Sequence, residues 1–200
     1  MKLLLALFLL SSYLSSVFML HCLDCTSESG QCNTELKQEC TDNQVCATLK
    51  YRFFISGVNI SSTEVKRSCH LRNECERWNT SNAGIIYSGN IGIASGTLFV
   101  SCCDSDNCNN IVIPELDSKP NGLQCMGCNN LADTVCNTTV SCVGNEDQCI
   151  KIQNESPVFW TPAEKSHTMG CISKSICDMN TNKLKLNQTL CCSENFCNKL

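Results

Sequence analysis

The sequence lacks an excess of positive charge. Lysine and arginine total 15 residues against 19 aspartates and glutamates, which gives a formal net charge of −4 at pH 7. Neither half of the chain carries a stripe of basic residues. Because the phosphates of nucleic acids and of anionic membranes attract clustered lysine and arginine, both are disfavoured as partners.

Motifs of catalytic and cofactor sites are also missing. The sequence contains no nucleophile elbow and no phosphate-binding loop, and His21, His70 and His167 are scattered without a second metal ligand at a useful spacing. A catalytic cleft needs a nucleophile, a base and an orienting group that converge in one pocket. We therefore expect a binding protein rather than an enzyme, with no cofactor and no metal.

The one long hydrophobic run lies at the N-terminus. Lys2 is followed by the apolar run Leu3–Leu10 and then by several serines, which is the order of a secretory signal. A membrane anchor is the alternative, but the serines interrupt the stretch and a single basic residue flanks it. We expect residues 1–20 to be a signal peptide that is removed.

The C-terminus lacks the hydrophobic tail that directs attachment of a lipid anchor. Only Asn198, Lys199 and Leu200 follow the last cysteine, whereas such a signal needs a tail of about 10 to 20 residues. We expect a secreted, extracellular protein without a membrane anchor.

Cysteine is abundant, with 20 residues in the chain. Ten lie between Cys22 and Cys108, and ten more lie between Cys125 and Cys197 in nearly the same spacing. Each set begins with two cysteines separated by two residues and ends with an adjacent pair, four residues, a last cysteine and an asparagine. The repeat predicts two copies of one module, 21–109 and 123–200, with a linker at 110–122.

An exported chain with an even number of cysteines is expected to hold them as disulfides. The spacing of Cys22 with Cys25, and of Cys125 with Cys128, also occurs in zinc and redox pairs, but a secreted repeat favours bridges. Modules of this size bury too little surface to be stable through a hydrophobic core alone. Bridges that contribute roughly 2 to 4 kcal/mol each supply the missing stability.

The pattern after the signal is that of strands, without the apolar spacing of three and four that an amphipathic helix requires. Apolar and polar residues alternate over Val45–Ile55, Ser56–Asn59 supplies a turn, and Thr63–Ser68 can return antiparallel. The second copy repeats this plan at Ile150–Gln153 and Thr168–Ile172. We expect an all-β, disulfide-rich fold made of hairpins.

The segments LHCLDC, SCCDSDNCNN, LQCMGC and LCCSENFCNKL resemble the lymphocyte-antigen-6/urokinase-receptor family. The resemblance covers essentially the whole chain after the signal. A domain of that family consists of three β-hairpin loops, or fingers, that leave a disulfide knot, as in snake toxins. The resemblance implies two tandem three-finger domains, with Asn109 and Asn198 as structural residues at their ends.

Cysteine counting alone leaves roughly a thousand pairings open for each copy, so the pairing is taken from the family. For the first copy the resemblance implies Cys22 with Cys46, Cys25 with Cys32, Cys40 with Cys69, Cys75 with Cys102, and Cys103 with Cys108. For the second copy it implies Cys125 with Cys149, Cys128 with Cys136, Cys142 with Cys171, Cys177 with Cys191, and Cys192 with Cys197.

The linker, with the motif PNG before the second set of cysteines, resembles the gamma-type phospholipase A2 inhibitors. These are secreted two-domain proteins in which the joining segment is implicated in inhibition. The resemblance implies that Ile113, Pro114 and Leu116 contact a partner, and that this partner is a secreted phospholipase A2. Asp117 and Lys119 depart from the apolar character of the inhibitors' joining segment.

A second candidate surface is the segment SPVFWTPA at 156–163. Its two prolines stiffen a hairpin tip that presents Phe159 and Trp160, and aromatic anchors on rigid loops frequently dominate binding energy. The alternative is that these aromatic side chains pack back onto the neighbouring hairpin or the first copy. Glu76–Ser101 is a third candidate, which we expect to be mainly a flexible finger.

Acceptor triplets for N-glycosylation fit an exported chain, and each reads Asn-X-Ser or Asn-X-Thr. They begin at Asn59, Asn79, Asn137, Asn154 and Asn187. Asn154 is the weakest acceptor because Pro157 directly follows its serine.

Two functional hypotheses follow from these features. In the first, the protein is an inhibitor that captures a soluble extracellular enzyme, with phospholipase A2 as the expected target. In the second, it is a secreted signal, a pheromone or a receptor-modulating ligand, because proteins similar to it have such roles. The tissue of expression separates the two hypotheses, and the sequence leaves the oligomeric state open.

Overall fold

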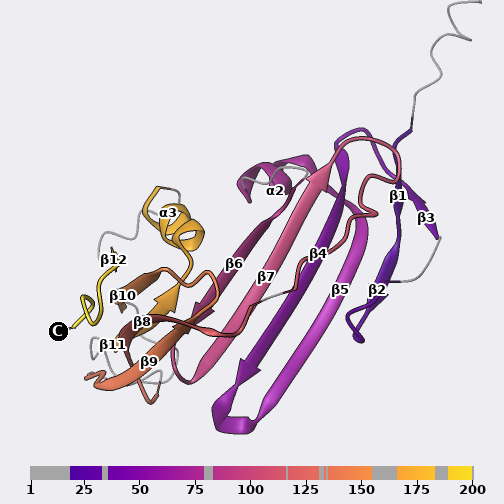
Figure 1. The fold of residues 1–200 in the computed structure, drawn as a ribbon. Helices are drawn as coiled ribbons and strands as arrows, with labels where there is room; N and C mark the ends of the chain where they lie inside the picture. The colour runs from indigo at the N-terminus through magenta and orange to yellow at the C-terminus, as the bar shows by residue number, and fades with distance from the viewer. Residues whose placement is uncertain are drawn as a thin grey trace, which may run out of the picture.

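The computed structural model describes residues 19–32, 36–78, 83–115, 117–130, 133, 135–154, 166–182 and 189–199. Strands make up 53% of the described residues, so the expected all-β class is confirmed. Figure 1 shows the strands of the two copies side by side, with the second copy on the left.

The first copy is built around a long hairpin. Strand β4 (Gln44–Ile55) pairs antiparallel with β5 (Ile60–Leu71) over its whole length, and η1 (Ser56–Val58) forms the turn. The expected hairpin is confirmed, and its period of two places Val45 and Ala47 on one buried face. The remaining elements are β1 (His21–Leu23), β2 (Cys25–Ser27), β3 (Lys37–Glu39), α2 (Arg72–Arg77), β6 (Ile85–Asn90) and β7 (Ala94–Cys103).

The second copy contains two hairpins. Strand β8 (Pro120–Gly127) pairs with β9 (Thr138–Val143), and β10 (Gln148–Asn154) pairs with β11 (Ser166–Ile172). The expected β10–β11 hairpin is confirmed. The copy is completed by α3 (Lys174–Asn182) and β12 (Thr189–Cys192). Because β8 begins at Pro120, the last three residues of the segment expected as a linker lie in a strand.

The expectation of a flexible finger over Glu76–Ser101 is wrong for its described part. Strands β6 and β7 form a regular hairpin, with Ile85 opposite Val100 and Asn90 opposite Ser95. The hairpin is ordered because Tyr87 and Val100 are buried in the core of the first copy, next to the Cys75–Cys102 disulfide. Helices α2 and α3 were not predicted, since six and nine residues are too few to show a clear helical period.

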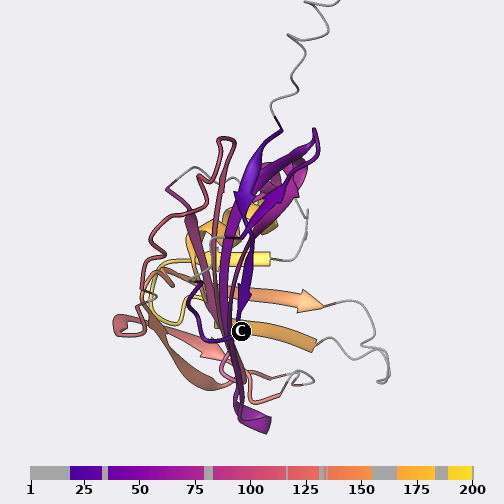
Figure 2. The same ribbon diagram turned by 90° about the vertical axis from the view of Figure 1, so that its right-hand side faces the viewer.

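One sheet extends across both copies in the described part of the chain. Its strand order is β12-β10-β11-β6-β7-β4-β5-β2, so β11 of the second copy pairs with β6 of the first. Figure 2 shows the orange β10–β11 hairpin running across the direction of the long first-copy strands. The approach is close enough to require glycine, because a Cβ atom at Gly170 would lie 2.1 Å from the carbonyl oxygen of Asn90.

All twenty cysteines are joined in disulfides, and every bridge lies within one copy. The pairs are Cys22 with Cys46, Cys25 with Cys32, Cys40 with Cys69, Cys75 with Cys102, Cys103 with Cys108, Cys125 with Cys149, Cys128 with Cys136, Cys142 with Cys171, Cys177 with Cys191, and Cys192 with Cys197. These are the same ten pairs that the family resemblance implies.

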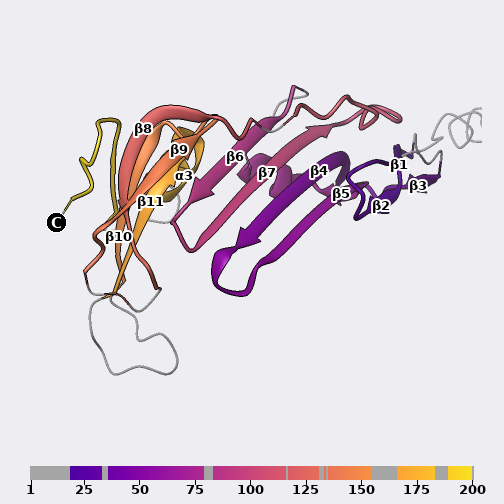
Figure 3. The same ribbon diagram turned by 60° about the horizontal axis from the view of Figure 1, so that its bottom comes forward.

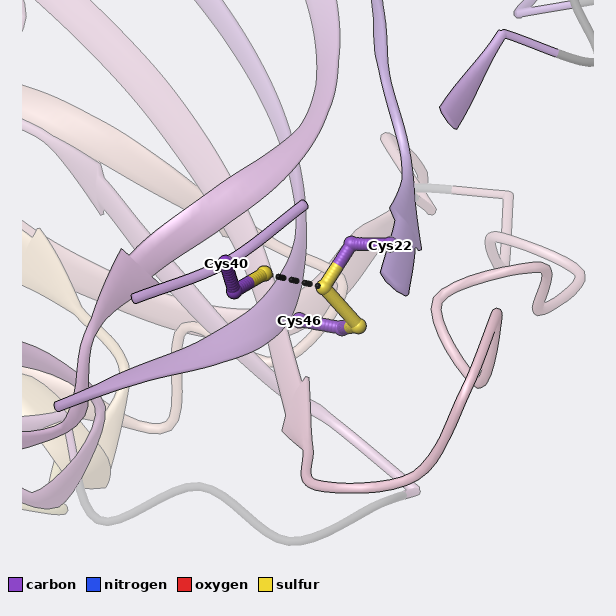
Figure 4. Close-up of side chains that lie close together, drawn as sticks. All are labelled: Cys22, Cys40 and Cys46. Carbon is purple, nitrogen blue, oxygen red and sulfur yellow. Dashed lines mark hydrogen bonds between the residues drawn. A yellow bond between two sulfur atoms is a disulfide. The ribbon is translucent and has the colours of Figure 1, made fainter. Parts of the chain in front are cut away.

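Two of the bridges in each copy touch at the centre of the knot. In the first copy the sulfur of Cys40 lies 3.0 Å from the sulfur of Cys22, which is bonded to Cys46 (Figure 4). In the second copy the equivalent sulfurs of Cys142 and Cys125 are 3.3 Å apart. All of these sulfurs are in disulfides and carry no hydrogen, so the approach is a packing contact.

The asparagine after each knot holds the ends of the copy together. The side-chain nitrogen of Asn109 donates to the carbonyl oxygens of Leu23 (2.9 Å) and Ala47 (3.2 Å), and its Oδ1 accepts from the Leu23 amide (2.9 Å). In the second copy, Asn198 makes the same three kinds of bond, to Met126 and Ile150. Both asparagines are buried, which makes their side chains part of each copy's polar core.

Replacing Asn109 by alanine should therefore destabilise the first copy by about 2 to 4 kcal/mol, because three buried hydrogen bonds are lost and backbone groups stay unpaired. Urea unfolding of the oxidised protein measures this change. Asn73→Ala, at an exposed position of α2, is the control, and we expect it to stay within about 0.5 kcal/mol of the wild type. Equal stability of the two variants would contradict the structural role of Asn109.

Candidate partner-binding site

The segment that joins the two copies lies on the first copy's sheet. Thr48 and Arg67 are opposite each other on β4 and β5. The Thr48 hydroxyl donates to the carbonyl oxygen of Asn109 (2.9 Å), and the Arg67 guanidinium donates to Asn110 Oδ1 (3.2 Å) and to the carbonyl oxygen of Ile111 (3.0 Å). Figure 1 shows this segment crossing the face of the sheet.

Arg67 anchors the joining segment from a buried position. Arg67 is only 9% exposed, and burial lowers the pKa of its guanidinium below the ordinary value. The group stays charged, because the pKa of arginine lies far above neutral pH. A charged donor that bonds to a carbonyl oxygen holds that backbone more strongly than a neutral donor does.

The exposed part of the joining segment is apolar. Ile111 and Ile113 are half-buried, whereas Val112 between them is 94% exposed and Pro114 is also exposed. An aliphatic side chain this exposed contributes no hydrophobic stabilisation to the fold of its own chain. Its burial by a partner would be favourable.

Beside the joining segment the two copies enclose a groove of about 470 Å³. Its walls come from β4, β5 and β7 of the first copy, from the joining segment and from the second copy. The lining includes Arg52, Phe54, Thr97, Asp117, Val143 and Glu146. The groove combines an aromatic side chain, hydroxyl groups and charges of both signs, so it offers both apolar and polar contacts to a partner.

Polar bonds fix the second copy against the groove. Glu146 is 1% exposed, and its carboxylate accepts hydrogen bonds from the Ser88 hydroxyl of the first copy (2.9 Å) and from the Val143 amide (3.0 Å). Ser88 and Ser173 are joined through the Ser173 amide and the Ser88 carbonyl oxygen (2.8 Å), and Asn145 donates to the carbonyl oxygen of Ile86 (3.0 Å). The two copies therefore present one continuous surface.

Burial raises the pKa of the Glu146 carboxyl, although the hydrogen bonds from Val143 and Ser88 act in the opposite direction. Desolvation is the larger effect because it penalises the charged form of a carboxyl that has left water.

The structure describes some of the residues proposed from the sequence and not others. Ile113 and Pro114 lie on the joining segment next to Val112, while Leu116, Phe159 and Trp160 lie outside the described residues. Among the glycosylation acceptors, Asn59 and Asn137 are exposed, Asn154 is the last residue of β10 with its side chain outside the description, and Asn79 and Asn187 lie outside the described residues.

Two groups of three cysteines have the spacing of a metal site, and neither offers ligands. They are Cys22, Cys40 and Cys46, shown in Figure 4, and Cys125, Cys142 and Cys171. A cysteine binds metal as a thiolate, whereas each of these sulfurs is already in a disulfide.

Sequence reasoning missed three functional features. The exposed apolar side chains at the turn of the long hairpin, the buried Glu146 and the anchoring role of Arg67 were not predicted. The first feature left a signal, because Val58 and Ile60 are apolar residues at a turn, where polar residues are more usual. The other two residues look like ordinary surface charges in the sequence.

Among the described residues, no helix combines the length and the apolar character that crossing a membrane demands.

A family model described as the u-PAR/Ly-6 domain matches the chain twice, over residues 19–111 and 121–200. The chain belongs to the u-PAR/Ly-6 family. Its two copies, each crosslinked by its own disulfides, are thus tandem u-PAR/Ly-6 domains of the three-finger type.

Several relatives of this u-PAR/Ly-6 chain are named as inhibitors. A gamma-type phospholipase A2 inhibitor of Elaphe climacophora is 42% identical over 81 residues, which cover 38% of this chain and 40% of that protein's length. Phospholipase A2 inhibitor NAI of Notechis ater is 27% identical over 184 residues, which cover 90% of this chain and 86% of the inhibitor. The crystal structure of mouse TEX101 matches 87% of this chain and 97% of that chain, with 11% identity and a TM-score of 0.32.

The raised pKa of Glu146 predicts a dependence of stability on pH. The folded protein binds the Glu146 proton more tightly than the unfolded chain does. Its contribution to the free energy of unfolding is therefore fully present below the ordinary carboxyl pKa of about 4.5. It decreases as the pH rises through the raised pKa. Glu146→Gln cannot titrate, so the stability of the wild type relative to this variant should fall over that window in urea unfolding. A difference that stays constant with pH would contradict the prediction.

Removing the Arg67 anchor should loosen the joining segment. In Arg67→Met the aliphatic packing is kept and the bonds to Asn110 and Ile111 are lost, so hydrogen exchange of the Asn110 amide, which donates to the carbonyl oxygen of Asn107, should accelerate about tenfold. Arg72→Met is the control, since Arg72 is an exposed arginine whose partner Asp104 is 3.8 Å away. Similar exchange in both variants would show that Arg67 does not hold the segment.

Proposed function

We propose that this chain is a secreted, non-catalytic binding protein that captures a phospholipase A2 and inhibits it. The observation that carries the proposal is the similarity to phospholipase A2 inhibitor NAI, which extends over 90% of the chain and therefore over both domains. Identity of 27% preserves a fold and a general role, while the choice of enzyme depends on this chain's own surface residues.

The joining segment is the proposed centre of the contact. It is held on the sheet before a partner arrives, so binding loses little conformational entropy there. Val112 and Pro114 offer exposed apolar surface, and further along the segment Asp117 lines the groove between the two copies. A partner that covers the segment would bury this apolar surface and contact both domains at once.

Capture of this kind would inhibit a lipase without any chemistry on the part of the binding protein. A phospholipase must place its own surface against a lipid layer to reach its substrate. An enzyme whose contact surface is covered by a rigid two-domain protein cannot do so. Leu116, Phe159 and Trp160 remain proposed contributors to the contact.

Export is part of the same proposal. We infer that residues 1–20 are a signal peptide and that 21–109 and 123–200 are the two domains, joined at 110–122. The ten disulfides are compatible with an oxidising, extracellular environment.

Substituting Val112 tests the proposed contact. In Val112→Asp a charge replaces an apolar side chain that is 94% exposed, so the fold should be unchanged and the affinity for the enzyme should fall about tenfold or more. Val135→Asp is a matched control, because Val135 is also an exposed valine, at 64%, and lies away from the joining segment. Binding is measured by calorimetry with a secreted phospholipase A2 of the same animal.

Two results would count against the proposal. If the wild-type protein at micromolar concentration neither binds nor slows any secreted phospholipase A2 of the animal, the proposed function is wrong. If it binds and the two valine variants bind equally well, the function stands and the joining segment is not the contact.

A further inference from the structure

The turn of the long β4–β5 hairpin carries a cluster of exposed apolar side chains. This apolar tip consists of Phe53, Phe54, Ile55, Val58 and Ile60. Val58 is 62% exposed and Ile60 is 50% exposed, and the η1 turn contains no buried residue. Figures 1 and 3 show the turn at the end of the hairpin, away from the disulfide knot of its domain.

Isolated exposed apolar residues are normal on protein surfaces, but five of them between Phe53 and Ile60, around one turn, favour a covering. The rest of the chain covers little of the apolar tip. The Ser56 amide and hydroxyl both donate to the carbonyl oxygen of Ile93 (3.0 Å each), which ties the start of the turn to the neighbouring β6–β7 hairpin. These bonds hold the backbone and leave the apolar side chains exposed.

Asn59 lies in the middle of the apolar tip. It adopts the left-handed backbone conformation, with φ 50° and ψ 40°, and its amide donates to the carbonyl oxygen of Ser56 (3.3 Å). Asparagine tolerates this conformation better than most residues. The residue is exposed, and Ser61 two positions later completes an acceptor triplet for N-glycosylation.

We propose that an N-linked glycan on Asn59 covers the apolar tip. In the transfer, Asn59 Nδ2 forms a bond to the anomeric carbon of an N-acetylglucosamine carried by a lipid diphosphate donor. The bond from that carbon to the donor breaks, the lipid diphosphate leaves as an anion, and the amide releases one proton. The exposed turn gives the transferring enzyme access to the nitrogen.

The geometry places apolar surface within reach of the first sugars. Ile55 and Ile60 are the last cross-strand pair before the turn, so they flank Asn59 directly. Phe53 lies two residues further along β4, which is about 7 Å at the usual rise of a strand. A pyranose ring can rest a face of C–H groups on these side chains and keep its hydroxyl groups in water.

The position of the acceptor favours a sugar over a lipid surface as the covering. Lys50, Arg52, Lys66 and the buried Arg67 against the single Glu64 make the β4–β5 hairpin locally basic, so a lipid surface is the other covering to consider. A hydrated glycan at the turn prevents insertion of these side chains into lipid.

The test uses the full chain, secreted from a eukaryotic cell that glycosylates. Glycopeptide mass spectrometry should find Asn59 occupied. Ser61→Ala abolishes the acceptor triplet and keeps Asn59 in its left-handed turn, and it should raise the fluorescence of a dye that binds apolar surface several-fold. Thr139→Ala is the matched control, because it abolishes the exposed Asn137 triplet and should leave dye binding unchanged.

A second substitution shows whether the dye reports the apolar tip. Val58→Ser in the glycosylated protein should leave dye binding unchanged, and Val58→Ser combined with Ser61→Ala should remove much of the increase. An unoccupied Asn59 in the secreted protein would overturn the proposal. Equal dye binding of Ser61→Ala and the wild type, or binding of the glycosylated wild type to phosphatidylserine vesicles through the tip, would overturn it as well.

Discussion

Disulfide crosslinking is the constraint on which the rest of this structure depends. Each domain closes five bridges, and two of them touch at the centre, as with Cys40 against the Cys22–Cys46 bridge. Many of the buried apolar residues are themselves cysteines, so the sulfur atoms take much of the place of a hydrocarbon core. Because bridges restrict the unfolded chain as well as packing the folded one, the hairpins can vary in sequence without loss of the fold.

No disulfide joins the two domains, and their contact rests on hydrogen bonds and packing. Only two residue pairs join β11 to β6, so the junction also depends on side chains such as Glu146, which reaches Ser88 from the other domain. Arg67 holds the joining segment on the sheet of the first domain by donating a hydrogen bond to the backbone carbonyl oxygen of Ile111. A partner that binds Val112 therefore contacts a segment whose conformation is already fixed. Such preorganisation lowers the entropy cost of binding.

The sequence predicted what local patterns encode. The alternation over Val45–Ile55 gave the long hairpin, and the cysteine spacing led to the family and, through it, to the same ten pairs that the structure contains. The pairing of β6 with β11 could not be predicted, because two short strands far apart in sequence leave no local signal. Glu146 could not be predicted for a similar reason: it lies in the polar run Asn145–Asp147, and its contact with Ser88 of the first domain joins residues far apart in sequence.

Disulfide mapping of the native, unreduced protein is the most direct test of this view. Digestion without reduction, followed by mass spectrometry of the linked peptides, identifies each pair of cysteines. We predict ten bridges, no free thiol and no peptide that links a cysteine of 22–108 to one of 125–197. A bridge between the two sets, or several unpaired cysteines in the folded, active protein, would contradict the claim that two separate sulfur knots hold the structure.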